Sequence, residues 1–345
     1  MRSKFLPAIL GVLFFGLTAC SADEKLEPAE RYNMQAVESV IQAYAKEYPT
    51  EKPKLNSSIS QNMGYDNNVN LNSSKEGDVF FETRFKFGIE KPFYLGFALW
   101  QDMKLKLDYN FNFIAYPEIT DASMINNNFN FNLQNRLVGK NILEFNYNFG
   151  LIDYPKYGPG SHRANRVSLG FKNYLTSKFY GRLGYGYLHK KYDDRKARYA
   201  NGTESGSERT DHRHIAELEA GYYLWEKTLL KLRGQYYIND SNDSYYDYYD
   251  YSSHKISLTA IHIFSEKFFG LLSFAQAFKD YGHRTTFDNS RVQEDEMFTI
   301  NTAFLYDFTP STSISLNLTY RENDSNEPRD EYTETIFSVG LHYSF

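Results

Sequence analysis

The sequence predicts an all-β fold, a transmembrane antiparallel up-and-down β-barrel of about 14 strands with a short helix before the first strand. Three observations carry this prediction. Apolar and polar residues alternate along nearly every segment after residue 55. The chain is 17% aromatic and yet hydrophilic on average, which suits strands with one side in lipid and one in water. The last strand, Thr335 to Phe345, alternates aromatic residues up to the carboxyl terminus.

Residues 1–19 are predicted to be a lipoprotein signal peptide. Two basic residues precede an apolar run from Phe5 to Leu17, which is too short for a stable membrane span. The order Leu17-Thr18-Ala19-Cys20 resembles a lipobox, in which cleavage before Cys20 allows acylation of that residue. The alternative is cleavage after Ala22, which removes Cys20 with the signal. The lipobox is favoured because this single cysteine cannot form an intrachain disulfide and otherwise has no use in an exported protein.

Residues 20–54 are predicted to be a lipid-anchored linker containing one short amphipathic helix between Pro28 and Pro49. Apolar residues recur there at helical spacing, at Met34, Val37, Ile41, Tyr44 and Tyr48. Three roles fit such a helix: a tether packed on the rim of the barrel, a plug, or a docking site for a partner. The tether is favoured because one short helix would fill little of a wide barrel.

Residues 55–345 carry the strand pattern. The alternation predicts strands over residues 55–65, 79–89, 103–113, 129–137, 143–151, 167–175, 179–187, 214–224, 230–238, 256–264, 268–278, 298–308, 314–320 and 335–345. The stretch from Glu90 to Asp102, which includes Trp100, is too apolar for an ordinary turn, so the strand ends around it are not assigned.

The predicted connections are of two kinds, short turns of a few residues and polar loops of roughly ten to twenty. This asymmetry is typical of outer-membrane barrels, which have short periplasmic turns and long extracellular loops. An even number of strands then places both termini in the periplasm of a Gram-negative bacterium. A soluble β-sandwich is disfavoured, because it would not place aromatic residues on the same face of nearly every strand and charges on the other. Tyr343 and Phe345 at the chain end resemble the signal by which the barrel-assembly machinery recognises such proteins.

The inward face of the predicted barrel carries more basic than acidic residues, together with many asparagines. The predicted pore-lining cations are Arg84, Lys86, Lys104, Lys106, Arg136, Lys172, Arg182, Arg213, Lys231, Arg233 and Lys255. They would form charge rings for an anionic or strongly hydroxylated solute, with the amides binding sugar hydroxyls. The alternative is that mixed charges pair across a water-filled lumen and hold it rigid. The overall net charge of −5 excludes a generally basic nucleic-acid-binding protein.

Three short segments at the two ends of the predicted barrel resemble a known family. The segments from Gly64 to Leu71, from Tyr320 to Asn326 and from Gly340 to Phe345 resemble the barrel domain of surface lipoprotein assembly modifiers. They are also similar to barrel proteins encoded with exopolysaccharide and capsule export systems. Assembly modifiers carry a large helical-repeat domain before the barrel, whereas this chain has only the segment from Pro28 to Tyr48. The resemblance therefore implies polysaccharide or small-solute passage more than lipoprotein translocation.

No enzymatic chemistry is predicted. Asp193, Asp194, Asp211 and His212 flank one long loop and offer the pairs that a water-activating protease uses, but a charge-rich loop produces such neighbours by chance. The stretch from Asn239 to Tyr251 offers acids and aromatic rings for Ca²⁺ or a sugar, but lacks the glycine and spacing of a calcium loop. We predict a solvated surface loop there, and no catalytic residue, metal site or cofactor.

The sequence thus predicts a porin-like outer-membrane barrel for passage or export of polar, anionic or glycan-like solutes. Its expected partners are outer-membrane lipid, the barrel-assembly machinery and an anionic oligosaccharide or polysaccharide, with no nucleic acid. The alternative is a non-conducting assembly or interaction barrel for surface lipoproteins or polysaccharide, acting through its loops or its periplasmic helix.

Overall fold

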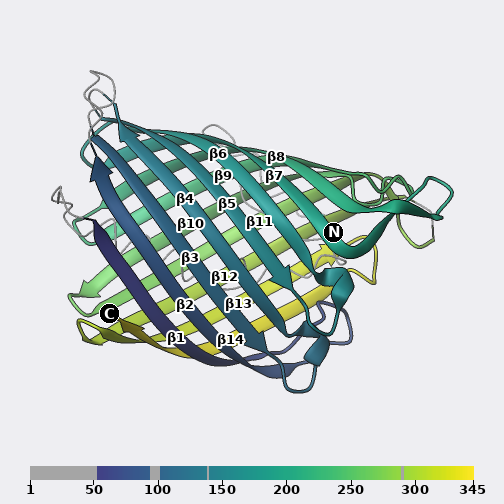
Figure 1. The fold of residues 1–345 in the computed structure, drawn as a ribbon, viewed down its shortest axis with the longest axis horizontal. Helices are drawn as coiled ribbons and strands as arrows, with labels where there is room; N and C mark the ends of the chain where they lie inside the picture. The colour runs from purple at the N-terminus through teal and green to yellow at the C-terminus, as the bar shows by residue number, and fades with distance from the viewer. Residues whose placement is uncertain (1–52, 94–101, 138–139, 289–290) are drawn as a thin grey trace, which may run out of the picture.

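The computed structural model describes residues 53–93, 102–137, 140–288 and 291–345. The predicted signal peptide, Cys20, the short helix and the segment around Trp100 lie outside these residues. Each strand pairs antiparallel with its neighbours in sequence, and the first strand pairs with the last, so that the sheet closes into a barrel (Figure 1). The strands are β1 (Lys54–Asp66), β2 (Asp78–Phe93), β3 (Asp102–Ala115), β4 (Met124–Arg136), β5 (Asn141–Asp153), β6 (His162–Tyr174), β7 (Phe179–Arg198), β8 (Glu204–Leu224), β9 (Thr228–Ser241), β10 (Tyr251–Ser265), β11 (Phe268–Thr285), β12 (Val292–Thr309), β13 (Thr312–Ser325) and β14 (Tyr332–Ser344).

The predicted all-β barrel of 14 strands is confirmed, and each predicted strand coincides with one in the structure. Two short 3₁₀ turns, η1 (Thr120–Ala122) and η2 (Gly158–Gly160), interrupt the connections after β3 and β5. No helix among the described residues is both long and apolar enough to cross a membrane.

The two faces of the sheet differ as the alternation requires. Large apolar side chains such as Leu55, Leu183 and Leu341 are 63%, 62% and 55% exposed on the outer face. In a membrane barrel that surface is covered by lipid. The residues between them point into the lumen and are mostly polar. Compact apolar clusters occur only at the two rims of the lumen among the described residues, because the middle of the lumen is lined by amides, hydroxyls and ion pairs.

Most of the long loops are shorter than predicted, although the loop between β1 and β2 has the expected length. The pairing of β7 with β8 continues to Arg198 and Glu204, which leaves a connection of residues 199–203 where a much longer loop was expected. This hairpin projects at the end of the barrel opposite the carboxyl terminus (Figure 1). The alternation of apolar and polar residues fades there because no outward side chain has to face lipid, while the backbone pairing goes on. Hydropathy therefore detects the membrane-embedded part of a strand and misses its extension into water.

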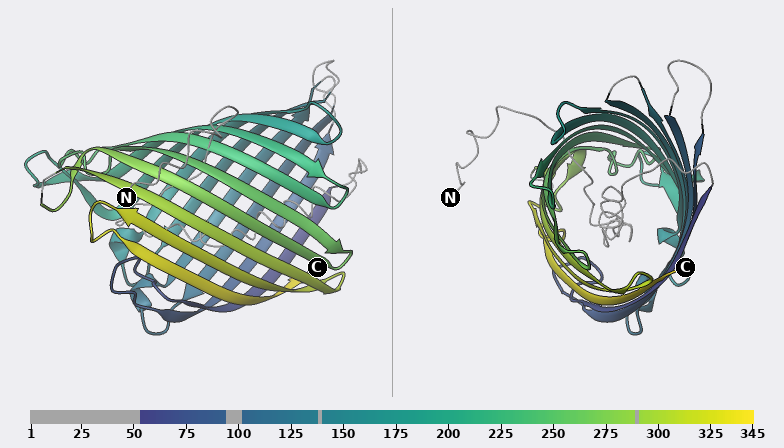
Figure 2. Two further views of the ribbon diagram at one scale, coloured as in Figure 1. Left: turned by 180° about the vertical axis from the view of Figure 1, so that it is seen from behind. Right: turned by 90° about the vertical axis from the view of Figure 1, so that its left-hand side faces the viewer.

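The barrel is closed by β1 and β14, which pair from Ser58 opposite Ser344 to Asp66 opposite Ile336. Beyond that ladder the backbone N–H of Phe345 donates to the carbonyl of Ser57 at 3.0 Å. Viewed from the end that carries Phe345, the strands form a complete ring (Figure 2). The first strand therefore starts, and the last one ends, on the side of the short turns.

Candidate pore lining

All eleven predicted pore-lining cations lie on the strand face opposite the lipid-facing aromatic residues. Arg182, for example, neighbours the outward Leu183, and only 16% of its side chain is exposed. The cations are distributed over β2 (Arg84, Lys86), β3 (Lys104, Lys106), β4 (Arg136), β6 (Lys172), β7 (Arg182), β8 (Arg213), β9 (Lys231, Arg233) and β10 (Lys255). They occupy one side of the ring, from β2 to β10.

The width of the lumen follows from the strand count. Fourteen strands about 4.8 Å apart and tilted by about 40° close into a ring about 28 Å across between backbones. Side chains that reach about 6 Å inward leave a bore of roughly 15 Å, between that of a filled small barrel and that of a large porin.

Acid–base pairs run along the wall formed by β5 to β9. The Nε of Arg182 donates to Glu144 at 2.8 Å, and its Nη1 donates to Glu217. Arg233 on β9 donates to Glu219 at 2.6 Å and lies 3.9 Å from Glu217. The pairs with Glu217 and Glu219 link neighbouring strands, whereas the contact of Arg182 with Glu144 reaches across β6 from β7 to β5. These contacts pair two of the eleven predicted cations, Arg182 and Arg233, with acids of the same wall, whereas the alternative interpretation expected pairing across the lumen.

Aromatic side chains at the short-turn end of the lumen contact the charged residues of this wall. The hydroxyl of Tyr180 donates to Glu219 at 2.9 Å, and the Nζ of Lys172 lies 3.9 Å from the centroid of the Tyr180 ring. Gly221 on β8 leaves the space for this ring, because a Cβ on Gly221 would lie 2.1 Å from a ring carbon of Tyr180. The position of the wall charges therefore depends on one glycine.

An asparagine ladder lines the lumen on β4 and β5, and the strand register places Asn110 of β3 beside it, opposite Asn128. Asn130 donates to Asn128 at 2.6 Å, and Asn148 donates to both, at 2.5 and 2.7 Å. Asn132 donates to Asn146 one rung closer to the short turns. Each amide offers donors as well as an acceptor, and in a ladder some of these face the lumen. Such a surface suits sugar hydroxyls, which both donate and accept.

The opposite wall, on β10 to β14, carries hydroxyls and amides in its middle, whereas charged residues such as Lys255 and the Arg321–Glu334 pair lie nearer the loop end. Thr259 and Ser273 share a hydrogen bond of 2.9 Å, and Thr319 donates to Asn301 at 3.0 Å. The lumen thus has a charged and amide-bearing side and a hydroxyl-bearing side.

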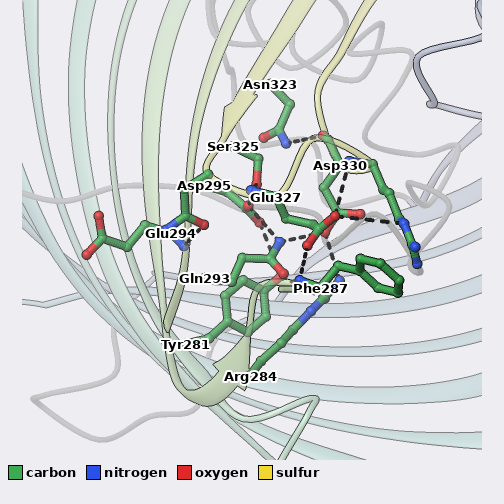
Figure 3. A network of polar contacts seen from close by, with 12 residues as sticks. Tyr281, Arg284, Phe287, Gln293, Glu294, Asp295, Asn323, Ser325, Glu327 and Asp330 are labelled. Carbon is green, nitrogen blue, oxygen red and sulfur yellow. Dashed lines mark hydrogen bonds and ion pairs between the residues drawn. The ribbon is translucent and has the colours of Figure 1, made fainter. Parts of the chain in front are cut away.

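Polar contacts hold the loops at the end away from the carboxyl terminus (Figure 3). Arg284 at the end of β11 donates to Asp330 in the β13–β14 loop at 2.8 Å, and Gln293 donates to the same carboxylate at 2.5 Å. Asp295 accepts from Gln293 at 2.9 Å and from Ser325 at 2.6 Å. Both side chains of the Arg284–Asp330 pair are less than a tenth exposed. The β11–β12 and β13–β14 loops therefore form one ordered rim.

The tyrosine-rich stretch that the sequence analysis singled out, from Asn239 to Tyr251, packs onto arginines. The guanidinium of Arg209, which is 1% exposed, lies 3.2 Å from the ring centroid of Tyr249. Asp243 accepts from the Nε of Arg198 at 2.9 Å. The prediction of a solvated surface loop is therefore wrong for Asp243, which is 1% exposed, whereas Tyr246 in the same stretch is 64% exposed, as predicted. Among the described residues, no group of three or more potential ligands is placed to hold a metal ion.

The structure does not assemble the acids and histidine that were weighed as a protease site. Asp211 points inward and is paired with Arg209 at 2.6 Å, whereas His212 points outward to the Tyr187 hydroxyl at 2.6 Å. Asp193 is paired with Arg163 at 2.8 Å. Adjacent positions on a strand face opposite sides, which separates two of the four residues.

Sequence reasoning missed several inward arginines, including Arg209, Arg284 and Arg321. All three are buried in ion pairs near the loop end, and Arg321 is paired with Glu334. The first two lie in segments expected to be loops, where no strand register was assigned. These residues lie where backbone pairing continues beyond the lipid-facing part of the strands. The hydropathy pattern does not reveal such pairing.

Comparison with known proteins identifies the fold of this chain but does not assign it to a family. No family model and no curated protein matches the chain. Among solved structures, OmpT, an outer membrane protein of Vibrio cholerae, superposes with a TM-score of 0.50 at 7% identity, covering 87% of this chain and 100% of that one. The outer membrane channel DcaP of Acinetobacter baumannii also gives 0.50, at 9% identity and with 85% and 97% covered. The chain has the fold of an outer-membrane β-barrel. At these identities, the likeness extends to the fold alone.

Proposed function

We propose that this barrel is a channel in the outer membrane of a Gram-negative bacterium for polar solutes that carry hydroxyl and anionic groups, such as acidic oligosaccharides. The observation that carries the proposal is the asparagine ladder of β4 and β5, placed beside the cation-bearing wall of β6 to β9 in a bore of roughly 15 Å. Amides match sugar hydroxyls and the wall cations match carboxylates or sulfates.

The same proposal assigns the ends of the barrel. The short turns and the start of β1 face the periplasm, and the ordered loop rim faces outward, as in other barrels of this kind. Tyr343 and Phe345, which are 49% and 65% exposed beside the seam, supply the signal for the barrel-assembly machinery. Their aromatic side chains continue the row of lipid-facing residues.

The test is single-channel conductance in planar bilayers. The chain from residue 20 onward, as the Cys20→Ser variant, is measured with and without residues 21–48, after folding of each form is verified by its heat-dependent electrophoretic mobility. We expect steady steps, and a drop in current when an acidic oligosaccharide is added. A neutral polymer of the same size serves as the control and should block less.

Silence from both folded forms contradicts the channel. That result would favour the non-conducting assembly or interaction barrel that acts through its loops or its periplasmic helix. Conduction with equal block by both polymers would instead contradict the solute class.

A further inference from the structure

A hydrogen-bonded pair of polar side chains lies in the middle of the lipid-facing surface, on β1 and β2. The Oγ1 of Thr83 donates to the Oε1 of Gln61 at 3.0 Å, and the two residues are direct cross-strand partners. On β1 the lipid-facing positions run from Leu55 to Tyr65, a span of about 25 Å along the barrel axis for a strand tilted by about 40°. Gln61 lies near the centre of that span, about 15 Å from Leu55.

The residues around Gln61 are large and apolar. Ile59 and Met63, the neighbouring outward residues on β1, are 40% and 58% exposed. Leu341 of β14 lies directly opposite Gln61 and is 55% exposed. Gln61 itself is exposed as well. A single barrel therefore presents an amide to the hydrocarbon core of the membrane.

One hydroxyl cannot satisfy this amide. A side-chain amide carries two N–H donors and a carbonyl acceptor with two lone pairs, and Thr83 supplies a single hydrogen bond. Among the residues that the structure describes, the Nε2 of Gln61 has no acceptor. Gln276, another lipid-facing glutamine, differs because its Nε2 donates to Glu296 at 2.8 Å. Hydrocarbon offers no hydrogen-bond partner, so an amide left in the position of Gln61 is costly.

Two other outward amides make no such demand. Asn127 accepts from the hydroxyl of Tyr109 and Asn165 from that of Tyr147, each at 2.8 Å. Both asparagines lie close to the loop ends of their strands, since β4 begins at Met124 and β6 begins at residue 162. Water and lipid headgroups supply the remaining hydrogen bonds there. Gln61 is too far from either end of β1 for that solution.

We propose that the surface of β1 and β2 binds a second copy of this chain, with the two Gln61 amides hydrogen-bonded to each other across a two-fold axis. Both copies insert in the same direction, so the axis runs along the membrane normal and places Gln61 at the same depth in each copy. An amide is complementary to itself, because the N–H of one donates to the carbonyl of the other. The contact thus supplies the missing hydrogen bonds of both amides at once.

The residues beside Gln61 suit this arrangement. β14, β1 and β2 lie side by side in the closed sheet (Figure 1), so the two-fold axis brings the β14 side of one copy against the β2 side of the other. The β14 side offers Val339 and Leu341, and the β2 side offers Phe81 and Phe87, all of them exposed. Apolar contact alone does not select a partner in a membrane, because lipid tails are equally apolar. The amide pair therefore determines which wall of the barrel forms the contact.

The contact is tested by measuring distances between spin labels on two copies with double electron–electron resonance. The background is Cys20→Ser, which removes the single cysteine of the chain, reconstituted in lipid vesicles. One label is placed at Lys54→Cys, at the start of β1, or at Lys178→Cys, in the β6–β7 turn on the far wall; both positions are exposed. For barrels about 28 Å across with sheets about 10 Å apart, we expect about 35 Å between copies for position 54 and about 65 Å for position 178.

Substitution of the amide separates this contact from random encounters. Gln61→Leu keeps most of the volume and removes the hydrogen bonds, so it should shift the midpoint of association roughly tenfold toward the monomer as the protein is diluted in lipid. Gln61→Asn keeps an amide and should retain part of the association. Gln276→Leu is the matched control, because it removes a lipid-facing glutamine whose partner lies in the same chain, and it should leave the association unchanged.

The proposal is supported if the 35 Å distance at position 54 is present with Gln61 and is lost in Gln61→Leu but not in Gln276→Leu. No distance between copies, or a short distance at position 178 in place of position 54, would overturn it. Association that Gln61→Leu leaves intact, or that both leucine variants weaken equally, would show that apolar contacts alone join the barrels and would overturn it as well. None of these results depends on whether the barrel conducts, so the contact and the proposed channel stand or fall separately.

Discussion

Charge reversal at the short-turn end of the lumen should change ion selectivity by an amount that depends on salt. Lys104 and Lys106 on β3 point into the bore, 3.0 Å from Glu90 and 3.2 Å from Asp108 respectively. About a quarter to a fifth of each lysine side chain is exposed, so their charges act on ions in the lumen. Substituting both by Glu changes the charge of this wall by four units.

The magnitude follows from Coulomb's law with screening. A unit charge about 8 Å from the axis contributes about 0.5 kcal/mol in water, reduced to about 0.2 kcal/mol by the Debye length of 0.1 M salt. Four units give about 0.9 kcal/mol, or roughly a fivefold change in local concentration for each ion. Because anions and cations shift in opposite directions, the anion-to-cation ratio should fall roughly 20-fold. In 1 M salt the Debye length shrinks to about 3 Å and the change should be less than about twofold.

The assay is the reversal potential across a planar bilayer under a salt gradient, near 0.1 M and near 1 M, on the conducting form of the barrel. The matched control is Lys178→Glu with Lys191→Glu, which changes the charge equally at an exposed turn and on the outer face. The control should leave selectivity nearly unchanged. A double lysine variant without effect at low salt, or with the same effect at both concentrations, would refute both the strand register and the open lumen.

Three further predictions concern stability. Burial raises the pKa of Asp250, in the β9–β10 loop, to about 6. Between about pH 4 and 6 the folded loop then holds a proton that the unfolded loop lacks, so the stability of the loop should fall as pH rises through that window. The measurement is the hydrogen-exchange protection of the loop amides relative to their intrinsic exchange rates, and Asp250→Asn should make this protection independent of pH over the same window. Gly221→Ala should cost about 1–3 kcal/mol in urea unfolding by displacing the Tyr180 ring, and added Tyr180→Ala should restore part of the loss; an unchanged midpoint would contradict this packing. Asp330→Asn leaves Arg284 buried without its ion pair, at a cost of about 3–5 kcal/mol, and should open the β13–β14 loop to limited proteolysis, whereas undisturbed cleavage rates would show that the pair does not hold the loop.

The strands could be predicted because every side chain that faces lipid has to be apolar. Phe81, Leu183 and Phe337 are far apart in sequence but all face outward, so alternation alone identified the lipid-facing part of each strand and the inward residues within that part. This requirement applies only to the part of each strand that lies in the membrane. Beyond it Arg198 and Glu204 still pair across β7 and β8, but nothing in their polarity marks them as strand residues.

The partners of the lumen residues could not be predicted for a different reason. The alternation of side chains along a strand shows that Arg182 faces inward. Its contact with Glu144 joins β7 to β5 and depends on how far the strands are staggered in the closed barrel. The asparagine ladder has the same origin. Asn130 and Asn148 meet because β4 and β5 pair in one register, in which a slip by one residue would turn every amide toward lipid. The sequence therefore predicts which side of the sheet a side chain faces, whereas its contacts depend on the register in which the closed barrel pairs its strands.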